Sequence, residues 1–231
     1  MAHILLTGGS RGIGAAIADR LRDAHSIAVQ STGGDLPADF ADPAAPADLW
    51  GRALDRLDGR IDILINNAGV FEANPIDQSD DDWVAAWERT LRINLTAAAE
   101  LSRLAVRHWQ EQGIPGRIVN IASRAAHRGD SPAHWHYAAA KAGMVAMTKT
   151  IARAYAREGI LAFAICPGFT MTGMAEDYVA SRGGDKLLAD IPLGRVAMPE
   201  EVAVMAAFCA TDAPESMTGA VLDVNGASYV R

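Results

Sequence analysis

Short apolar runs along this chain alternate with longer segments in which apolar residues recur at helical spacing. Such runs are typical of strands buried in a parallel sheet, and the helical spacing is typical of amphipathic helices. The predicted strands are His3–Thr7, Ser26–Gln30, Ala38–Ala41, Ile61–Asn66, Arg117–Ala122, Ile160–Cys166 and Ala220–Val224. The predicted helices cover 12–23, 44–57, 80–112, 134–158 and 199–210. This alternation predicts an α/β fold, a Rossmann-like doubly wound parallel sheet of about seven strands.

Polar residues and a proline mark where two of these helices begin. Ser79 stands three residues before Asp82, which is the spacing of a capping box. Pro199 precedes two glutamates, and a first helical turn tolerates proline and favours negative charge. Because no internal repeat or low-complexity linker interrupts the pattern, we expect one dinucleotide-binding and catalytic domain over residues 1–231.

The segment between the second and third predicted strands is short for this fold. Seven residues, Ser31–Pro37, separate the two strands, whereas a parallel crossover normally needs a dozen or more. Either the usual helix is shortened or missing and the chain crosses directly, or 38–41 is not a full strand.

Composition narrows the class of protein. The 231 residues are 50% hydrophobic and 21% charged, which predicts a sizeable core and argues against disorder. The net charge of −7 and the lack of a basic run argue against nucleic-acid binding. Cys166 and Cys209 lack CxxC spacing, so we expect reduced thiols. Without a signal-peptide pattern, or an apolar run near the ~20 residues of a membrane span, the sequence predicts a soluble, cytoplasmic protein.

A glycine-rich turn joins the first predicted strand to the first helix. Gly8, Gly12 and Gly14 stand in this turn. Glycines there allow a tight turn and a close approach of the backbone to a pyrophosphate, whose charge the helix N-terminus favours. The position of the turn, more than its composition, indicates a dinucleotide site.

The end of the second predicted strand bears on which nicotinamide cofactor is bound. The strand runs into Ser31 and Thr32, and no acid follows until Asp35. A ribose 2′-phosphate prefers arginine and hydroxyl groups, and Arg11 in the glycine turn faces the same corner. The sequence therefore favours NADPH, although Asp35 would favour NADH if the short loop folded it onto the ribose.

Seven motifs follow one another along the chain: TGGSRGIG (7–14), NNAG (66–69), INL (93–95), IVNIAS (118–123), YAAAK (137–141), CPGFTMT (166–172) and the C-terminal IPLGRVAMPEEVA with TGAVLDVNG. In this order they resemble the short-chain dehydrogenase/reductase family, and most of all its bacterial 3-oxoacyl-[acyl-carrier-protein] reductases. They span nearly the whole chain. The resemblance implies a seven-stranded sheet with the cofactor at the carboxyl ends of the strands.

The resemblance also implies which residues contact the cofactor. Asp39 and Phe40 match the pair that contacts adenine, and Pro167 begins the loop that holds the nicotinamide carboxamide. The implied cofactor residues are Gly8, Ser10, Arg11, Gly12, Ile13, Gly14, Ser31, Thr32, Asp39, Phe40, Asn67, Ala68, Gly69, Tyr137, Lys141, Pro167, Gly168, Thr170 and Thr172.

Asn94, Ser123, Tyr137 and Lys141 match the family's catalytic tetrad. A carbonyl that receives hydride needs a proton, and an unperturbed phenol with a pKa of about 10 is a poor donor near neutrality. Lys141, at i+4 on the same helical face, is expected to lower the pKa of Tyr137. Ser123 would hydrogen-bond the substrate oxygen, and Asn94 would hold a water that links Lys141 to solvent.

Two features depart from the family's pattern. The family usually has a full helix between its second and third strands, and this sequence lacks the residues for such a helix. The adenosine side of the cofactor site is therefore expected to be shorter. The interval from Ser123 to Tyr137 is one residue longer than usual, which is expected to reshape the mouth of the substrate site.

His127, His134 and His136 fall around the predicted site and raise the alternative of a metal centre. The His-x-His spacing at a helix start points two rings to different sides. No carboxylate or cysteine stands at ligand spacing nearby, so the sequence predicts no metal site.

Two interpretations of the same stretch stay open. His134, Trp135 and His136 are either ordinary surface residues or line the substrate mouth with Arg124 or Arg128. The second arrangement would favour an anionic or aromatic substrate.

The segment 173–191 follows the predicted nicotinamide loop. It is either a plain surface helix or a substrate lid, with Met171, Met174 and Tyr178 facing the pocket.

The sequence thus predicts an NAD(P)-dependent enzyme that interconverts a ketone and a secondary alcohol, with NADPH-dependent carbonyl reduction favoured. The alternatives are an NAD-dependent alcohol or sugar dehydrogenase and a catalytically idle NADP-sensing module. The substrate is a small carbonyl or alcohol compound: a 3-oxoacyl thioester, a cyclic ketone, a sugar or a steroid-like alcohol. By analogy with the family, a homotetramer built on the helices at 80–112 and 134–158 is expected, and a dimer is the alternative.

Overall fold

A seven-stranded parallel sheet forms the centre of the molecule. A computed structural model describes residues 1–171 and 188–230. The sheet order is β3-β2-β1-β4-β5-β6-β7, and every neighbouring pair is parallel. The strands are β1 (His3–Leu6), β2 (Ser26–Ser31), β3 (Leu36–Pro37), β4 (Ile63–Asn66), β5 (Gly116–Ile121), β6 (Ile160–Pro167) and β7 (Val221–Val224). The predicted Rossmann-like doubly wound sheet is therefore confirmed.

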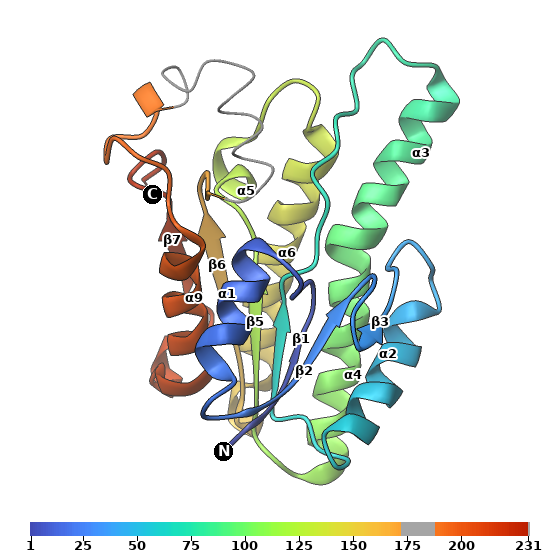
Figure 1. Cartoon of the computed structure of the whole chain (residues 1–231), viewed down its shortest axis with the longest axis vertical. Helices are drawn as coiled ribbons and strands as arrows, with labels where there is room; N and C mark the ends of the chain where they lie inside the picture. Colours follow the sequence, from blue (N-terminus) through green and yellow to red (C-terminus); the bar gives the residue numbers. More distant parts are fainter. Residues whose placement is uncertain (172–187, 231) are drawn as a thin grey trace.

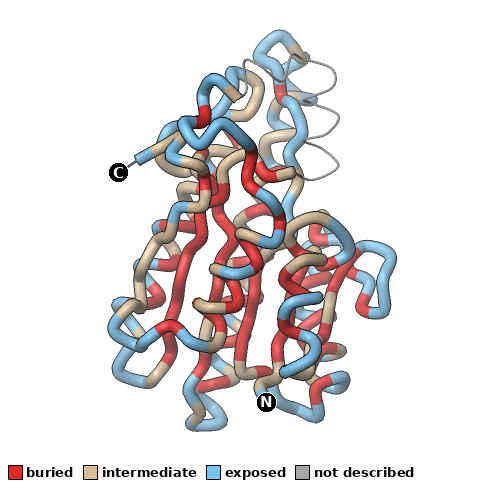
Figure 2. Tube along the Cα trace, turned by 60° about the vertical axis from the view of Figure 1, so that its left-hand side comes forward, coloured by how far each residue is buried: buried red, intermediate tan, exposed pale blue. Residues whose placement is uncertain are grey.

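Helices cover both faces of this sheet (Figure 1). The α-helices are α1 (Gly12–Leu21), α2 (Ala45–Arg56), α3 (Asp80–Leu91), α4 (Ala97–Gln112), α5 (Ala125–Arg128), α6 (Trp135–Tyr155) and α9 (Pro199–Ala207). Leu5 packs into a core shared with α2, α4 and α6, while its neighbours Ile4 and Leu6 pack toward α1 and α9. Successive residues of a strand point to opposite faces, which explains the continuous apolar runs. Figure 2 shows these buried strands running through the centre of the molecule.

The predicted helix at 80–112 is a continuous helical stretch with a change of pitch in the middle. Ser79 caps its start by accepting a hydrogen bond from the backbone N of Asp82, which confirms the predicted cap. A π-helical turn, Arg92–Thr96, separates α3 from α4. The wider turn was not predicted, and it contains Asn94. Single π-turns within α-helices are frequent at functional sites.

The third strand lies earlier than predicted. Leu36 and Pro37 pair with Gln30 and Ser31 of β2, so the prediction of a strand at 38–41 is wrong. Asp39 begins a turn instead, because its carboxylate accepts a hydrogen bond from the backbone N of Ala41 at 2.9 Å. Only residues 32–35 join the two strands, so the chain crosses directly without a helix.

The missing crossover helix leaves a hollow on one face of the sheet. α1 and α9 cover this face, and beside α1 a cavity of about 520 Å³ opens over β2. Apolar and polar groups line it together, among them Ala18, Arg22, Ile27, Val29, Ser31 and Asp35. The second strand therefore keeps Ile27 and Val29 only partly buried.

The remaining predicted helices are present with small shifts at their ends. The helix at 134–158 begins at Trp135 and ends as a short 3-10 turn, and the helix at 199–210 becomes π-helical after Ala207. The four-residue α5 was not predicted. Most of the predicted lid at 173–191, with Met174 and Tyr178, lies outside the described residues. Among the described residues, no helix combines the length and apolar character that a membrane crossing needs.

Candidate active site

The strand order reverses between β1 and β4, because β2 follows on one side of β1 and β4 lies on the other. In open α/β sheets, ligands bind at the carboxyl ends of the strands beside such a switch point. The glycine turn follows β1, the NNAG motif ends β4, Ser123 follows β5 and Pro167 ends β6. The fold therefore brings these four predicted motifs to one edge of the sheet.

The glycine turn and the NNAG motif are in direct contact. Gly8 has a positive φ of 68°, and a Cβ there would lie 2.7 Å from the Cα of Ala68. A Cβ on Gly14 would lie 2.1 Å from the carbonyl oxygen of Gly8. The Asn67 side chain donates to the carbonyls of Thr7 and Gly8 at 3.1 and 2.9 Å. Both glycines are therefore required by backbone packing, which leaves the close backbone surface that a pyrophosphate needs.

Two residues that the sequence analysis missed hold this turn. The Thr7 hydroxyl accepts hydrogen bonds from the backbone N of Asn67 and Ala68 at 3.0 and 3.1 Å. The buried Gln30 side chain accepts from Gly8 N at 2.8 Å and donates to the Ala38 carbonyl at 2.7 Å. Their signal in the sequence is a polar residue at the end of an apolar strand, because a buried polar group needs partners.

The adenosine end of the site combines attractive and opposing groups. Ser10 and Ser31 line the cavity beside α1, and the exposed Asp35 lines it too. Arg11 is the N-cap residue of α1, exposed and extended, and its side chain makes no capping bond there. Thr32 is exposed in the crossing loop. Asp35 therefore lies at the same cavity as Ser10 and Ser31, where its carboxylate would oppose a 2′-phosphate.

The predicted adenine pair takes two different positions. Asp39 is exposed, but its carboxylate caps the turn at Ala41. The Phe40 side chain is buried in the core against α2 and α4. Only the backbone of Phe40 is left to face a nucleotide, and the Arg92 guanidinium donates to its carbonyl at 3.3 Å.

Tyr137 and Lys141 lie one turn apart on α6, as predicted from their spacing. The Lys141 ammonium lies 5.8 Å from the centre of the Tyr137 ring. Its Nζ donates to the carbonyl of Ile121, at the end of β5, at 2.8 Å. Lys141 is 4% exposed, so this carbonyl holds an otherwise desolvated cation at the floor of the site.

The protein alone does not give Tyr137 the lowered pKa that the sequence analysis expected. Burial raises the pKa of Tyr137 to about 12, and the hydrogen bond with Ser123 opposes this only in part. Burial also lowers the pKa of Lys141 to about 8, while Cys166 works in the other direction. Because the ammonium loses its proton before the phenol does, it gives no positive charge to stabilise the phenolate in that pH range.

Ser123 lies where the substrate oxygen is expected. It lies two residues beyond the end of β5, is 8% exposed, and is near enough to Tyr137 to lower the pKa of the phenol. Its Oγ also accepts from the backbone N of Ala125 at 3.1 Å, at the start of α5. The hydroxyl is thereby fixed beside the phenol, and the two groups together can bind one carbonyl oxygen.

The Asn94 side chain is buried, and its hydrogen bonds hold the loop that follows β4. Its side chain is fully buried in the π-turn and forms two hydrogen bonds with Val70, one to the backbone N and one to the carbonyl, both 2.8 Å. Gly69 passes between, since a Cβ there would lie 3.3 Å from Asn94 Oδ1 and 3.6 Å from Lys141 Nζ. Asn94 thus fixes the loop after β4 against the lysine, a role that the sequence analysis did not predict.

The predicted nicotinamide loop is tied to two neighbouring strands. Gly168 donates from its backbone N to the Val224 carbonyl at 2.9 Å, and a Cβ there would lie 2.8 Å from the Cβ of Asn225. The Pro167 carbonyl accepts from the backbone N of Arg124 at 2.9 Å. The buried Thr170 donates to the Gly168 carbonyl at 3.2 Å. Thr172 lies outside the described residues.

The three residues before Tyr137 do not act as one group. The His134 ring stacks on Phe71 with centroids 3.9 Å apart, and Phe71 meets the edge of Tyr137 at 4.8 Å. Trp135 is exposed and lines a separate cleft with Trp83. His136 is buried against Trp87, where desolvation lowers its pKa. Of the three, only His134 borders the phenol, through Phe71.

The two predicted mouth arginines also differ. Arg128 donates to Asp190 at 2.7 Å and to the Ser228 carbonyl at 3.0 Å. Arg124, next to Ser123, lies 4.7 Å above the Phe169 ring and 3.8 Å from Asp190. Its buried Nη1 has no hydrogen-bond partner in the described part of the chain. Desolvation is the main cause that lowers the pKa of this guanidinium, followed by the charge of Arg128.

Comparison with known proteins decides the family. A family model described as enoyl-(acyl carrier protein) reductase matches residues 9–227. The chain belongs to the short-chain dehydrogenase/reductase family. It is 33% identical to the 3-oxoacyl-[acyl-carrier-protein] reductase of Salmonella typhimurium, over 98% of this chain and 96% of the relative.

Other relatives in the family have different names. The chain is 35% identical to the cis-4-hydroxycyclohexanecarboxylate dehydrogenase of Sinomonas cyclohexanicum, over 96% of this chain and 94% of the relative. A solved structure of a candidate 2-deoxy-D-gluconate 3-dehydrogenase from Agrobacterium tumefaciens, with bound NADP, superposes with a TM-score of 0.84 at 31% identity. It covers 96% of this chain and 94% of that one. The short-chain dehydrogenase/reductase described here is therefore an oxidoreductase acting on CH–OH and C=O groups.

Proposed function

We propose that this short-chain dehydrogenase/reductase reduces a ketone to a secondary alcohol with NADPH. The observation that supports this most is the placement of Ser123, Tyr137 and Lys141 around one point at the carboxyl end of β5. The glycine turn and the Pro167 loop flank that point. Bound NADPH would supply the hydride, and the residues of the chain would supply the rest.

The role of each residue follows from its position. Ser123 and Tyr137 would hydrogen-bond the carbonyl oxygen, which increases the positive character of its carbon. As negative charge develops on oxygen, the phenol proton passes to it. Burial keeps Tyr137 protonated at neutral pH, so the proton is present, but the raised pKa makes the phenol by itself a weaker acid than a free tyrosine. Lys141, held by the Ile121 carbonyl, would hydrogen-bond the nicotinamide ribose and return a proton to the phenolate.

The preference for NADPH rests on Arg11, Ser31 and Thr32, and Asp35 opposes it. Arg11 is exposed at the start of α1, and Ser31 lies on the cavity that runs along β2. A 2′-phosphate in this corner would gain charge-assisted hydrogen bonds. Fluorescence titration with NADPH and NADH tests the assignment, and tighter binding of NADH would overturn it.

Arg124 favours a substrate that carries a carboxylate. Arg124 is adjacent to Ser123 in the chain, and its buried Nη1 lies 3.8 Å from Asp190 but has no hydrogen-bond partner in the described part of the chain. The Sinomonas and Agrobacterium proteins named above are described as a cis-4-hydroxycyclohexanecarboxylate dehydrogenase and a candidate 2-deoxy-D-gluconate 3-dehydrogenase, and both of the named substrates carry a carboxylate. A 3-oxoacyl thioester, suggested by the Salmonella relative, is the other candidate substrate.

A matched pair of ketones separates these substrates. We expect 4-oxocyclohexanecarboxylate to be reduced with a lower KM than cyclohexanone, which lacks the carboxylate. Arg124→Ala should raise KM about 10- to 100-fold for the acid alone, the usual value of a hydrogen bond to a charged group. Arg128→Ala, whose guanidinium is held by Asp190 and Ser228, is the matched control. If KM does not change with Arg124→Ala, the carboxylate assignment is wrong, and a 3-oxoacyl thioester becomes the first candidate.

The alternative of an idle NADP-sensing module is tested with the same assay. Three catalytic side chains would be unnecessary in a sensor. If NADPH binds but neither the ketones nor the thioester turn over, and Tyr137→Phe changes nothing, the sensor is favoured. If turnover is faster with NAD and the alcohol, the enzyme is an NAD-dependent dehydrogenase.

We further propose a homotetramer, with a dimer as the alternative. Val84 on α3 and Trp135 at the start of α6 are exposed apolar side chains on the two helices that the family is expected to pair. Light scattering after size-exclusion chromatography measures the mass, and a monomer would contradict the proposal.

A further inference from the structure

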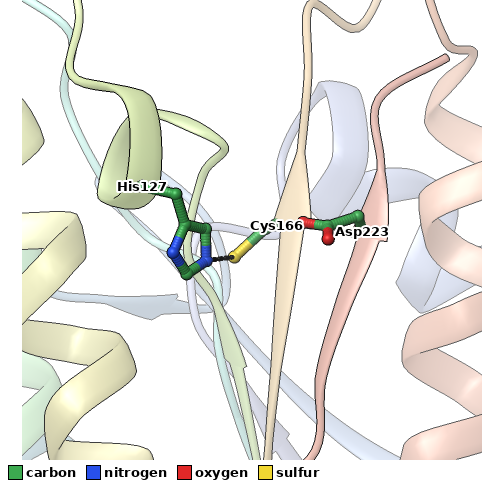
Figure 3. Close-up of side chains that lie close together, drawn as sticks. All are labelled: His127, Cys166 and Asp223. Carbon is green, nitrogen blue, oxygen red and sulfur yellow. Dashed lines mark hydrogen bonds between the residues drawn. The ribbon is translucent and has the colours of Figure 1, made fainter. Parts of the chain in front are cut away.

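Three potential metal ligands meet on the α6 side of the sheet, outside the proposed catalytic groups. His127 comes from α5, Cys166 from β6 and Asp223 from β7 (Figure 3). Cys166 and Asp223 are register partners in the parallel β6–β7 pair. Partners of this kind point to the same face of a sheet, so the thiol and the carboxylate lie side by side. α5 then brings the imidazole over the thiol.

The spacing of these groups suits tetrahedral coordination. His127 Nε2 lies 3.6 Å from Cys166 Sγ, and one ligand atom from each of the three residues lies within 4.8 Å of the others. Zinc bonds of about 2.0–2.1 Å to nitrogen and 2.3 Å to sulfur, at a tetrahedral angle, place the two ligand atoms about 3.5 Å apart. The His127–Cys166 pair already has this separation, and Asp223 needs only a small side-chain movement.

Burial and neighbouring contacts support a built site with a route of entry. Cys166 is fully buried, His127 is half-buried, and Asp223 is exposed. An ion can therefore arrive from the side of the carboxylate. The His127 ring is stacked on Tyr229, with centroids 5.5 Å apart and planes 3° from parallel, which limits its rotation. The β6–β7 ladder fixes the backbones of the other two ligands.

We propose that His127, Cys166 and Asp223 bind one divalent transition-metal ion, Zn²⁺ in the first place. Thiolate and imidazole select zinc over Mg²⁺ and Ca²⁺, which prefer oxygen ligands. The ion would replace the thiol proton, and a water would complete the tetrahedron. This site was not predicted, because no cysteine or carboxylate stands at ligand spacing near these histidines along the chain. The fold supplies both, from positions 39 and 96 residues downstream of His127.

The position of the site gives it a consequence for the enzyme. α5 begins two residues after Ser123, and Cys166 directly precedes Pro167 of the predicted cofactor loop. A bound ion would cross-link the segment that positions the substrate oxygen to the segment that positions the nicotinamide. We expect it to stiffen both segments and to raise thermal stability, without a part in hydride transfer.

Cobalt titration of the chelator-treated full-length enzyme tests the site directly. Co²⁺ should bind at one equivalent and give a near-ultraviolet sulfur-to-cobalt charge-transfer band with the visible bands of tetrahedral cobalt. Zn²⁺ should displace it and raise Tm. Cys166→Ala should abolish the charge-transfer band. Asp223→Asn should weaken binding by at least about tenfold, since even outer-shell changes at metal sites cost that much.

Matched variants keep the outcome clear. Cys209→Ala removes the other buried thiol, which lies in the π-helical turn after α9, and should leave the band unchanged. Asp212→Asn is the corresponding carboxylate control. Since Asp223 is exposed, its variant should fold even if Cys166→Ala does not. The proposal is overturned if no sulfur-to-cobalt band forms, if the band survives Cys166→Ala, or if Asp223→Asn binds as tightly as the native enzyme.

Discussion

The two ends of the nucleotide cleft are built in different ways. At the catalytic end, Tyr137 and Lys141 stand on the long helix α6, and Ser123 lies in the short turn between β5 and α5, where the backbone N of Ala125 donates to its hydroxyl. At the adenosine end, residues 32–35 cross between two strands without a helix and leave a cavity of about 520 Å³ over β2. One end is fixed by secondary structure and the other by a short exposed loop.

The two ends should therefore differ in how well they tolerate substitutions. Moving Tyr137 or Lys141 would disturb α6 and its contacts with β6. Changing the crossing loop affects few packed groups, because Thr32, Gly33, Gly34 and Asp35 are all exposed. We infer that the catalytic residues are positioned by packed elements of the fold, whereas the choice of cofactor depends on exposed loop side chains whose substitution costs little stability.

The largest expected effect is at the catalytic end. Tyr137→Phe removes the proposed proton donor and should lower kcat/KM by about 10²- to 10⁴-fold, the usual contribution of general acid catalysis. NADPH affinity should stay within about twofold, since the ring itself is kept. Steady-state kinetics and fluorescence titration measure the two quantities. Tyr155→Phe, at the far end of the same helix, is the control and should be neutral. Equal turnover by both variants would remove Tyr137 from the mechanism.

The next effect concerns the stability cost of the buried lysine. The pKa of Lys141 falls to about 8 from the 10.5 of an exposed lysine, because burial disfavours its charge. Below pH 8 the lysine is charged in both the folded and the unfolded state, and the full cost is present. Between pH 8 and 10.5 only the folded state loses the proton, and the cost disappears.

The cost amounts to roughly 3 kcal/mol of the free energy of unfolding, at 1.36 kcal/mol for each pKa unit. The native enzyme should therefore gain most of this stability relative to Lys141→Met as the pH rises from 7 to 10. Tyr137, with its raised pKa, adds no pH dependence below pH 10. Urea unfolding at several pH values measures the difference. Lys149→Met, exposed on the same helix, should give a curve parallel to the native one. A flat difference for Lys141→Met would mean that the lysine is not desolvated.

How far the sequence could predict this molecule also differs between the two ends. The i, i+4 spacing on α6 and the strand-end position of Ser123 follow from local rules, so the placement of these residues could be predicted, whereas their catalytic roles were inferred from the resemblance to the family. No spacing or composition in the sequence predicts the π-turn that contains Asn94, or the two hydrogen bonds between Asn94 and the backbone of Val70. The strand prediction at 38–41 failed because Ala38–Ala41 has apolar alternation, but Asp39 forms a turn instead.

Contacts between distant residues were the least predictable. Thr7 and Gln30 hold the glycine turn through bonds to residues that the sheet brings close, 60 and 22 positions away along the chain. His127, Cys166 and Asp223 meet only because β6 and β7 pair in one particular register. Spacing along the chain carries no information about such meetings, which depend on strand order and register.

A smaller effect is expected at the adenosine end. Arg11→Ala should weaken NADPH binding about 10-fold, the value of one hydrogen bond to a charged group, and should leave NADH binding nearly unchanged. Asp35→Asn should act in the opposite direction and strengthen NADPH binding by a few-fold. Paired titrations measure both. Asp55→Asn, on α2, serves as the charge control. If Arg11→Ala weakens both cofactors equally, the residue contacts a shared phosphate rather than the 2′-phosphate.

The smallest effect is expected from one methyl group in the crossing loop. A Cβ on Gly33 would meet nothing within 4 Å, and its φ lies outside the left-handed region. Gly33→Ala should therefore stabilise the enzyme by about 0.4–1 kcal/mol, because it removes conformational freedom from the unfolded chain. Gly8→Ala is the matched opposite, since its φ is 68° and its Cβ would lie 2.7 Å from Ala68 Cα. It should destabilise the fold and abolish NADPH binding. Unfolding midpoints and NADPH titrations of the two variants measure this contrast. If Gly33→Ala destabilised as Gly8→Ala does, the crossing loop would be as constrained as the glycine turn, and the distinction between the two ends of the cleft would fail.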